Sequence, residues 1–484
     1  MTVSRHKKER FLRMKKTLVI LCITLIMWSC VDERYSTNIS DKLEFSTSEL
    51  RMDTAFVESQ TWHFMVYNRG SKALNIEHIG LKGGKESAFS VNVDGRKMDN
   101  TRGLDNITVR TKDSLMVRVE CTVRNADGEA MFMMMRDTVI FLTNGNTQEV
   151  ALEMTGRSAI RLENFQMVSD MTLVPDMPYL VVGYLYVPEG MKLTIEAGTE
   201  IFMHKGANII VDGEIEIDGE IGNMVRIRGD RFDDLHDGGV EIPYNNIPGQ
   251  WGGIYLQNAQ GKNRISGADI RSGGVGILLF GAGRARPELT IENSKIHCFS
   301  SYGVYSQMGK VEILNSEISN CGQSCLMVVG GETIVQQSTI ADYFTFATRK
   351  TAAVRVAGYA EQYGQRTLYP VERFTIENTV VWGAMSNELE IIKDTNETFN
   401  LWIANSMLKV KEKDEAWKQC ITDDGGKEVF VCTEAKYDRG EEKYFNFALA
   451  DESAGRGIGD DRISGLYRVK LNGDTRSTCD AGCW

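Results

Sequence analysis

Leu289-Thr-Ile-Glu-Asn-Ser-Lys-Ile296 is the stretch that decides the fold of this 484-residue chain, because it returns twice. The second copy is Val311-Glu-Ile-Leu-Asn-Ser-Glu-Ile318, and the third is Thr333-Ile-Val-Gln-Gln-Ser-Thr-Ile340, each displaced by 22 residues from the one before. Alternating apolar and polar residues predict a strand with one buried face. A fixed short period predicts a repeat architecture.

The length of the repeat limits what each unit can be. About 22 residues cannot hold a strand and a crossover helix, which together need roughly 30, and no helical periodicity lies between the copies. We therefore expect an all-β parallel solenoid with two or three short strands in each coil, stacked about 4.8 Å apart. The alternative is an ordinary β-sandwich with coincidental Asn-Ser pairs, which three copies in strict register disfavour.

The fifth position of each copy is a residue with a carboxamide side chain. Asn tolerates the left-handed backbone of a sharp corner, and stacked carboxamides can bond to one another along a ladder. We therefore expect Asn293, Asn315 and Gln337 to form a column. Upstream, Gly267 stands at the corresponding position of Asn263-Arg-Ile-Ser-Gly-Ala-Asp-Ile270.

The signature recurs twice more, at wider spacing. It appears as Phe374-Thr-Ile-Glu-Asn-Thr-Val-Val381 and as Leu401-Trp-Ile-Ala-Asn-Ser-Met-Leu408. We interpret the gap of 41 residues before Asn378 as two coils with altered turns. The gap of 27 residues before Asn405 is interpreted as one coil with a longer loop.

The first 30 residues have a composition of their own. Lys15 and Lys16 precede the apolar run 18–28, which is too short for a membrane span and has the length of a secretory signal. Met27-Trp-Ser-Cys30 resembles the lipobox of bacterial lipoproteins, although Met27 replaces the more usual Leu. The resemblance implies that Cys30 is acylated and becomes the mature N-terminus. The alternative is a plain cleaved signal with an incidental cysteine.

The residues after Cys30 indicate where the protein is located in the cell. Val31-Asp-Glu33 resembles the acidic export signal of lipoproteins in Bacteroidetes-type bacteria, which implies a lipid-anchored position on the outer membrane, exposed at the cell surface. Residues 1–29 hold seven basic residues and one acidic residue, so without them the formal net charge falls from −11 to −17. Such an acidic protein repels phosphate backbones, which excludes nucleic acid as a partner.

Residues 43–158, after a polar tether at 31–42, read as short alternating strands. Asn144-Gly145 is a strong hairpin signal. Val66-Tyr-Asn-Arg-Gly70, Thr138-Val-Ile-Phe-Leu-Thr-Asn-Gly145 and Val150-Ala-Leu-Glu-Met-Thr-Gly156 resemble the Ig-like domains of the Hydin and sperm-protein type. The resemblance implies an Ig-like β-sandwich.

Residues 159–450 are expected to form the solenoid, with 451–484 as its closing segment. Leu193-Thr-Ile-Glu-Ala-Gly-Thr199, Pro248-Gly-Gln-Trp-Gly-Gly-Ile254 and Ser453-Ala-Gly-Arg-Gly-Ile-Gly459 resemble right-handed parallel β-helix proteins of Bacteroidetes, which share the pectate-lyase-like fold. The resemblance is specific for the fold and carries little about function.

The longest early insertion offers carboxylates. Asp230, Asp233, Asp234 and Asp237 lie within eight residues and can cup Ca²⁺, which prefers six to eight oxygen ligands. They lack the glycine-containing spacing of an EF-hand, so a solvated loop is the simpler interpretation. No other metal or cofactor is indicated, since the Cys-x-x-x-Cys pairs have no adjacent His or Cys.

A second insertion combines aromatic rings with a cation. Tyr359, Tyr363, Arg366 and Tyr369 lie in it and suit stacking on sugars or peptides. The alternative is a turn packed down by its own tyrosines. Loops on a rigid coil are where ligand binding is usually found.

Three functions remain open. The lipobox, the solenoid and the absence of a recognisable catalytic set favour a surface lipoprotein that binds a glycan or another surface protein. The first alternative is a polysaccharide lyase or glycosidase, but its carboxylate and cation candidates show no diagnostic spacing; they are Glu372, Glu377, Glu388 and Glu390 with Arg373 and Lys393. The second alternative is a structural spacer of the cell envelope.

Overall fold

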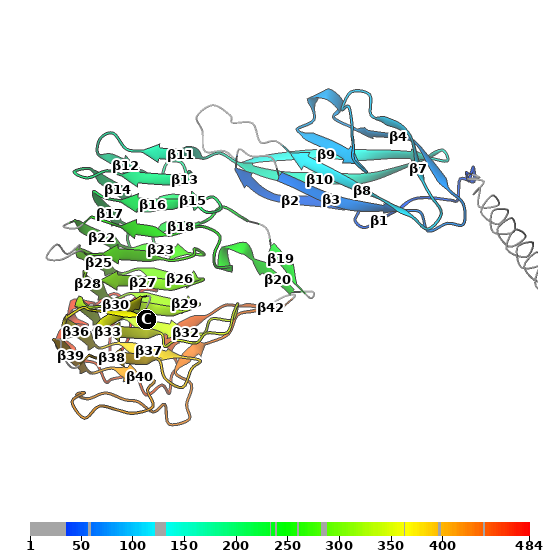
Figure 1. Ribbon diagram of the computed structural model, residues 1–484. Helices are drawn as coiled ribbons and strands as arrows, with labels where there is room; N and C mark the ends of the chain where they lie inside the picture. Colours follow the sequence, from blue (N-terminus) through cyan, green and yellow to red (C-terminus); the bar gives the residue numbers. More distant parts are fainter. Residues whose placement is uncertain are drawn as a thin grey trace, which may run out of the picture. The chain divides into compact units, whose positions relative to one another are not determined.

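The computed structural model describes residues 35–484 apart from 57–59, 122–131, 233, 238–239, 259–260, 282–287, 363, 395–397 and 439–440. The chain divides into two compact units, the first built from most of the residues before 155 and the second containing residues 155–484 (Figure 1). Among the described residues, no helix has both the length and the apolar character needed to cross a membrane. Cys30 lies outside them.

The first unit consists of two five-stranded sheets. Their strands are, in order, β1 (Glu44–Phe45), β3 (Gln60–Tyr67), β8 (Ser114–Cys121), β5 (Phe89–Val93) and β6 (Arg96–Lys97), and then β2 (Glu49–Phe56), β10 (Asn146–Arg157), β9 (Phe132–Thr143), β4 (Leu74–Leu81) and β7 (Leu104–Val109). The ring centroids of Phe64 and Phe141 lie 6.2 Å apart, which joins β3 of one sheet to β9 of the other. Both rings are buried, so the core lies between the sheets.

The second unit is a coil of parallel strands (Figure 1). A nine-stranded sheet forms one side of the coil. Its strands are β12 (Met171–Leu173), β14 (Lys192–Glu196), β17 (Glu214–Asp218), β22 (Lys262–Ser266), β25 (Glu288–Glu292), β28 (Lys310–Leu314), β31 (Gly331–Gln336), β36 (Val371–Glu377) and β39 (Phe399–Ala404).

A seventeen-stranded sheet supplies two further columns of strands. The first column is β11 (Ile160–Gln166), the start of β13 (Tyr179–Val187), β15 (Glu200–Met203), β18 (Val225–Gly229), β23 (Ala268–Arg271), β26 (Lys295–Phe299), β29 (Glu317–Cys321), β32 (Thr339–Asp342), β37 (Val380–Gly383) and β40 (Met407–Leu408). The second column is the end of β13, β16 (Asn208–Val211), β21 (Ile254–Leu256), β24 (Ile277–Phe280), β27 (Tyr302–Gln307), β30 (Ser324–Val329), β33 (Val354–Ala357) and β38 (Leu389–Ile392). Three strands per coil agree with the expectation from the repeat length.

Side chains alternate between the inside and the outside along most of these strands, as the sequence pattern requires. The inward side chains are aliphatic, and Ile277 of β24 and Ile291 of β25 are both fully buried in one continuous core. The outward side chains differ from column to column, so they carry whatever is specific to this protein.

The predicted polar column is confirmed. Asn293, Asn315 and Gln337 have φ angles of 52°, 44° and 50°, the left-handed conformation of a corner. The Asn315 Nδ2 donates to Asn293 Oδ1 at 2.8 Å. Lower in the column, the Asn378 Nδ2 donates to Gln337 Oε1 at 3.1 Å, and Gly267 has a φ of 56° at the upper end.

A second column, of hydroxyls, lies immediately after the corner. The backbone N–H of Ser294 donates to Ser316 Oγ at 3.1 Å, that of Ser316 to Ser338 Oγ at 3.2 Å, and that of Thr379 to Ser406 Oγ at 3.1 Å. These hydroxyls are buried, and they satisfy corner N–H groups that would otherwise lose their hydrogen bonds. The repeated Ser after each corner residue was visible in the sequence, but its role was not.

The interpretation of the 41-residue gap is wrong. Strand β36 pairs directly with β31, so one coil and not two separates Gln337 from Asn378. The extra length leaves the coil as two insertions, residues 343–353 and 358–370, and the second contains the hairpin of β34 (Tyr359–Gln362) and β35 (Gln365–Leu368). The 27-residue gap is one coil, as predicted, because β39 pairs with β36.

The C-terminal residues do not add coils but run back along the Asn column. Gln337 Nε2 donates to the carbonyls of Asp480 and Gly482, both at 2.7 Å, and Asn405 Nδ2 donates to that of Ile458 at 3.1 Å. The short helix α2 (Asp461–Leu466) is part of this segment. The corner amides therefore bind both one another and the end of the chain.

The remaining strands form short antiparallel pairs outside the coil. They are β19 (Asp234–Asp237) with β20 (Val240–Pro243), β41 (Phe430–Cys432) with β44 (Asn446–Leu449), and β42 (Lys436–Asp438) with β43 (Glu441–Lys443).

Candidate ligand-binding face

The outward side chains of the second column form a strip of aromatic and aliphatic groups. The strand register places one such residue on each of six successive coils; in order they are Tyr186, Ile210, Tyr255, Leu278, Tyr305 and Met327. We call this strip, with the neighbouring Tyr184 and Phe280, the tyrosine face. All its members are at least partly exposed to solvent, and Phe280 is 41% exposed.

Ring contacts hold the middle of the tyrosine face in place. The ring of Tyr305 lies 5.7 Å from that of Phe280 and 5.4 Å from that of Tyr302. Burial among these rings raises the pKa of Tyr305, so its phenol, already neutral at pH 7, ionises even less readily. The strip ends at an ion pair on the next two coils, where Arg355 Nε lies 2.5 Å from Glu390 Oε2.

The outer face of the nine-stranded sheet is different. Many of its outward side chains are charged, and several pair with one another, as in Lys192–Glu216 at 2.5 Å and Arg264–Glu292 at 2.5 Å. Arg264 also reaches Asp218 at 2.9 Å. We call this surface the charged face, and it has the character of a solvated surface.

The outer face of the first column is covered by the chain itself. The Arg228 guanidinium lies 5.1 Å from the ring centroid of Phe202 and 4.7 Å from that of Phe232, which belongs to the following insertion. Burial here and the neighbouring Arg271 lower the pKa of Arg228 to about 10. Farther along, the Cys298 thiol donates to the carbonyl of Asn246 at 2.8 Å. Of the three outer faces, the tyrosine face therefore combines exposure with apolar chemistry.

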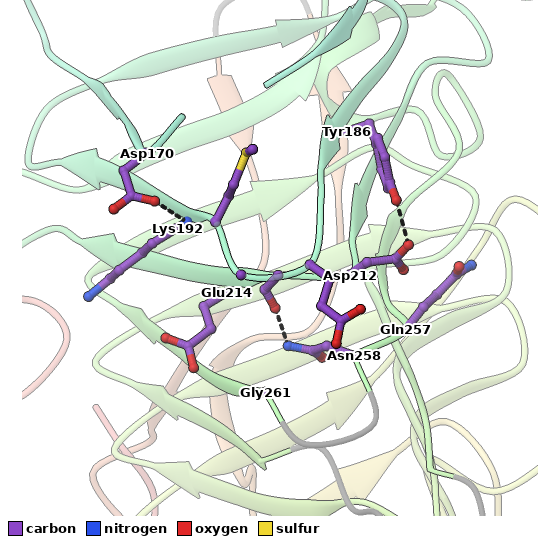
Figure 2. Close-up of a pocket in the computed structure, with 12 residues that line it drawn as sticks. Asp170, Tyr186, Lys192, Asp212, Glu214, Gln257, Asn258 and Gly261 are labelled. Carbon is purple, nitrogen blue, oxygen red and sulfur yellow. Dashed lines mark hydrogen bonds between the residues drawn. The ribbon is translucent and has the colours of Figure 1, made fainter. Parts of the chain in front are cut away.

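A groove of about 980 Å³ opens beside the upper end of the tyrosine face (Figure 2). It lies where the turns lead from the second column to the nine-stranded sheet. Four of its lining residues are carboxylates: Asp170, Glu189, Asp212 and Glu214.

Hydrogen bonds fix the walls of the groove. The Tyr186 hydroxyl donates to Asp212 Oδ2 at 2.7 Å, and the backbone N–H of Lys192 donates to Asp170 Oδ1 at 2.9 Å (Figure 2). The buried Asn258 side chain donates to the carbonyl of Gly213. Figure 2 also shows Gln257, whose side chain is exposed, on the same side as Asp212. The groove thus presents carboxylates and an amide next to an aromatic ring.

The predicted tyrosine-arginine cluster lies in the hairpin β34–β35. The Arg366 guanidinium stacks 4.0 Å from the ring centroid of Tyr359 and pairs with Glu361 at 2.7 Å and with Asp394 at 3.0 Å. These contacts occupy the groups that were expected to hold a ligand. Tyr369 instead reaches the second column, where its hydroxyl accepts from Gln307 Nε2 at 3.2 Å. Tyr363 lies outside the described residues.

The predicted Ca²⁺ ligands are only partly described. Asp230 Oδ2 lies 2.6 Å from His204 Nδ1. Asp234 and Asp237 are the two ends of strand β19, while Asp233 and the side chains of that strand lie outside the description. Within the part of the chain that is described, no group of three or more His, Cys, Asp or Glu is arranged to hold a metal. A calcium site at this loop stays a prediction.

The carboxylates considered for a lyase are engaged elsewhere. Glu388 is fully buried and accepts two hydrogen bonds from Arg349, at 2.5 and 2.6 Å. Glu377 accepts from Trp402 Nε1 at 2.9 Å on the charged face. Glu390 pairs with Arg355 at the end of the tyrosine face. They therefore do not form one cluster.

Arg349 and Glu388 also enclose a third buried charge, Asp342. Burial raises the pKa of Asp342 to about 7; Arg349, 3.4 Å away, opposes this and the Glu388 carboxylate reinforces it. Backbone N–H groups of Cys321 and Phe344 donate to Asp342 Oδ1 at 3.2 and 3.3 Å. The cluster fastens the insertion 343–353 to the coil.

The tyrosine face was missed at the level of sequence. Its successive strip residues are 22 to 45 positions apart, because insertions of unequal length separate successive strands. The signal was present as a polar or aromatic residue between two inward aliphatic ones, as in Ile254-Tyr-Leu256. The register of the coils was needed to place these residues in one line.

Comparison with known proteins supports the fold. Residues 252–348 match the family model of the right-handed β-helix region. That segment covers β21 to β32, which include the coils with the strictest repeat. No curated protein matches this chain.

Solved structures resemble it only in part. They include a protein of unknown function from Porphyromonas gingivalis W83 (14% identity, TM-score 0.18, 23% of this chain and 45% of that one) and the VesB protease of Vibrio cholerae (15%, 0.18, 25% and 33%). The CooA pilin subunit of enterotoxigenic Escherichia coli is a third (11%, 0.18, 24% and 97%). This chain thus spans less than half of the first two, and none of the three informs on function.

Proposed function

We propose that this protein is a lipid-anchored lipoprotein of the bacterial outer membrane whose β-helix binds a glycan through the tyrosine face. The observation that carries the proposal is the line of partly exposed aromatic and aliphatic side chains on six successive coils. Aromatic rings that remain exposed on a rigid surface are suited to stack on the apolar faces of sugar rings.

The enzymatic alternative would have to use the groove at one end of the strip, because the six strip residues themselves include no carboxylate. A lyase or glycosidase needs an acid and a base within reach of one bond. On the tyrosine face the charged groups are the paired Arg355 and Glu390 at one end and the acidic groove at the other. Binding without turnover is therefore the better account of this surface.

Anchoring is proposed from the sequence, through the lipobox that ends at Cys30. The two-sheet unit then serves as an Ig-like spacer that holds the β-helix away from the membrane. A Cys30→Ser variant should lose incorporation of radiolabelled palmitate and leave the membrane fraction, whereas Cys22→Ser, in the same signal, should behave as the parent. Retention of the Cys30→Ser variant in the membrane would refute the anchor.

The binding function is tested with the full-length protein in detergent and a panel of insoluble polysaccharides. Stacking on one exposed ring is worth on the order of 1 kcal/mol, or about fivefold in affinity. The triple variant Tyr186→Ala/Tyr255→Ala/Tyr305→Ala should therefore no longer bind detectably. Trp402→Ala is the matched control, because Trp402 is an exposed aromatic residue on the charged face.

The outcomes separate the three functions. Retention on a polysaccharide that the triple variant loses supports the proposal. Release of soluble or unsaturated oligosaccharides from the same panel would point instead to a lyase or glycosidase. Neither retention nor release would leave the protein as a structural spacer and overturn the binding proposal.

A further inference from the structure

Along the strip of the tyrosine face, tyrosines and aliphatic residues alternate from coil to coil. Tyr186, Tyr255 and Tyr305 lie on every second coil, and Ile210 and Leu278 occupy the coils between. Neighbouring strands in a sheet lie about 4.8 Å apart, so successive tyrosines are about 9.6 Å apart. The strip thus has a period of two coils.

That period matches a particular kind of chain. In an extended β-linked glycan, each sugar is turned over relative to the last, so the same ring face returns once per disaccharide. A disaccharide in such a chain is about as long as two coils of this β-helix. Alternate sugars can therefore stack on successive tyrosines, while the sugars between them lie over Ile210 and Leu278.

The charge around the strip restricts the ligand further. The groove next to Tyr186 holds the carboxylates of Asp170, Glu189, Asp212 and Glu214. Its lysine, Lys192, has its ammonium group 2.5 Å from Glu216, which is outside the groove. At the other end, Arg355 is paired with Glu390. A chain of uronates or sulfated sugars would meet repulsion at the groove, because the only cation among its described lining residues, Lys192, is already paired, whereas sugar hydroxyls can donate to its carboxylates.

We propose that the tyrosine face binds a neutral, extended β-linked glycan, with its disaccharide repeat in register with pairs of coils. This inference rests on the proposed function and names the class of ligand. Tyr186, Tyr255 and Tyr305 hold alternate sugars, and the groove carboxylates accept hydrogen bonds from the hydroxyls of the sugar nearest Tyr186.

The experiment measures calorimetric affinities of the full-length protein for oligosaccharides of defined length. The neutral probes are linear β-linked gluco-, manno- and xylo-oligosaccharides from the dimer to the octamer. Malto-oligosaccharides, which are α-linked and curved, and oligogalacturonates, which are acidic, serve as comparisons at equal lengths. For the best neutral series, affinity should rise from dimer to tetramer to hexamer and then level off, because the tyrosines span four coil spacings.

Two sets of variants test separately how the spaced tyrosines and the groove charge contribute to affinity. Tyr255→Ala should weaken hexamer binding about fivefold, and Tyr255→Phe, which keeps the ring, should not. For the parent protein, oligogalacturonates should bind at least tenfold more weakly than the neutral probes. The double variant Glu189→Gln/Glu214→Gln should narrow that difference.

Two results would overturn this inference while leaving the proposed function intact. One is oligogalacturonate or malto-oligosaccharide binding that equals or exceeds that of every neutral β-linked series and is lost in Tyr255→Ala. The other is neutral binding that is complete at the dimer. If no oligosaccharide or polysaccharide binds at all, both the inference and the proposed function fall.

Discussion

The charged face and the tyrosine face are built on the same coils, yet their surfaces have opposite chemistry. Inside, Ile291 of the nine-stranded sheet and Ile277 of the second column are equivalent: both are aliphatic and fully buried. Outside, Arg264 pairs with acidic neighbours, whereas Tyr255 lies between Ile210 and Leu278. Because the inner residues form the core, the outer aromatic strip is not part of that core, and the proposed ligand binding depends on it.

The largest effect on the free energy of unfolding is expected for the buried charges, not for the exposed ones. Arg349→Met should lower the free energy of unfolding by about 3–5 kcal/mol, because Asp342 and Glu388 would be left buried without their cation. Urea does not screen charges, so urea denaturation of the parent and the variant measures this difference in the free energy of unfolding. A decrease smaller than about 1 kcal/mol would show that water enters the cluster and solvates the two carboxylates.

The equivalence of the two interiors can be tested directly. Ile277→Ala and Ile291→Ala should each lower the free energy of unfolding by about 3 kcal/mol, since each removes a fully buried side chain and leaves a cavity. The same urea titrations compare them. A clear difference between the two variants would mean that the sheets do not contribute equally, and the comparison of their outer faces would lose its basis.

The buried carboxyl of Asp342 should make stability depend on pH. Its pKa is about 7 when folded and 3.8 in the unfolded chain, so between these values the folded protein binds more protons. The free energy of unfolding should therefore fall as pH rises from about 4 to about 7, by roughly 3 kcal/mol. The Asp342→Asn variant should show a flatter profile over this range, and an unchanged slope would assign the effect to other groups.

The smallest effect is expected on the charged face. Arg264→Met should change the free energy of unfolding by less than about 1 kcal/mol, because its pairs with Asp218 and Glu292 are exposed to solvent and screened by salt. It should also leave glycan affinity unchanged, which Tyr255→Ala should not. Loss of binding in Arg264→Met would show that the ligand contacts the charged face.

The sequence was most informative where the repeat is strict. The copies at Asn293, Asn315 and Gln337 predicted the left-handed corner, the column and the parallel coil, because each depends on local residue type and spacing. The same reasoning failed between Gln337 and Asn378, where two insertions lengthen a single coil. Length alone cannot distinguish an extra coil from a loop that leaves the coil and returns.

The candidate site was less accessible to such reasoning. Tyr359 and Arg366 attracted attention because they are close in sequence, but they contact each other and nearby carboxylates. Tyr186, Tyr255 and Tyr305 are far apart in sequence and become a line only through the pairing of their strands.

By itself, then, the sequence determined the all-β coil, its period and its polar corner, since these follow from alternation and from backbone conformations open to a few residue types. The tertiary structure alone decided which outward side chains share a face, which charges are buried and where the C-terminal segment binds. The physical reason is that a coil brings together residues separated by whole turns and insertions of unequal length, and only hydrogen-bonded register fixes which residue lies above which.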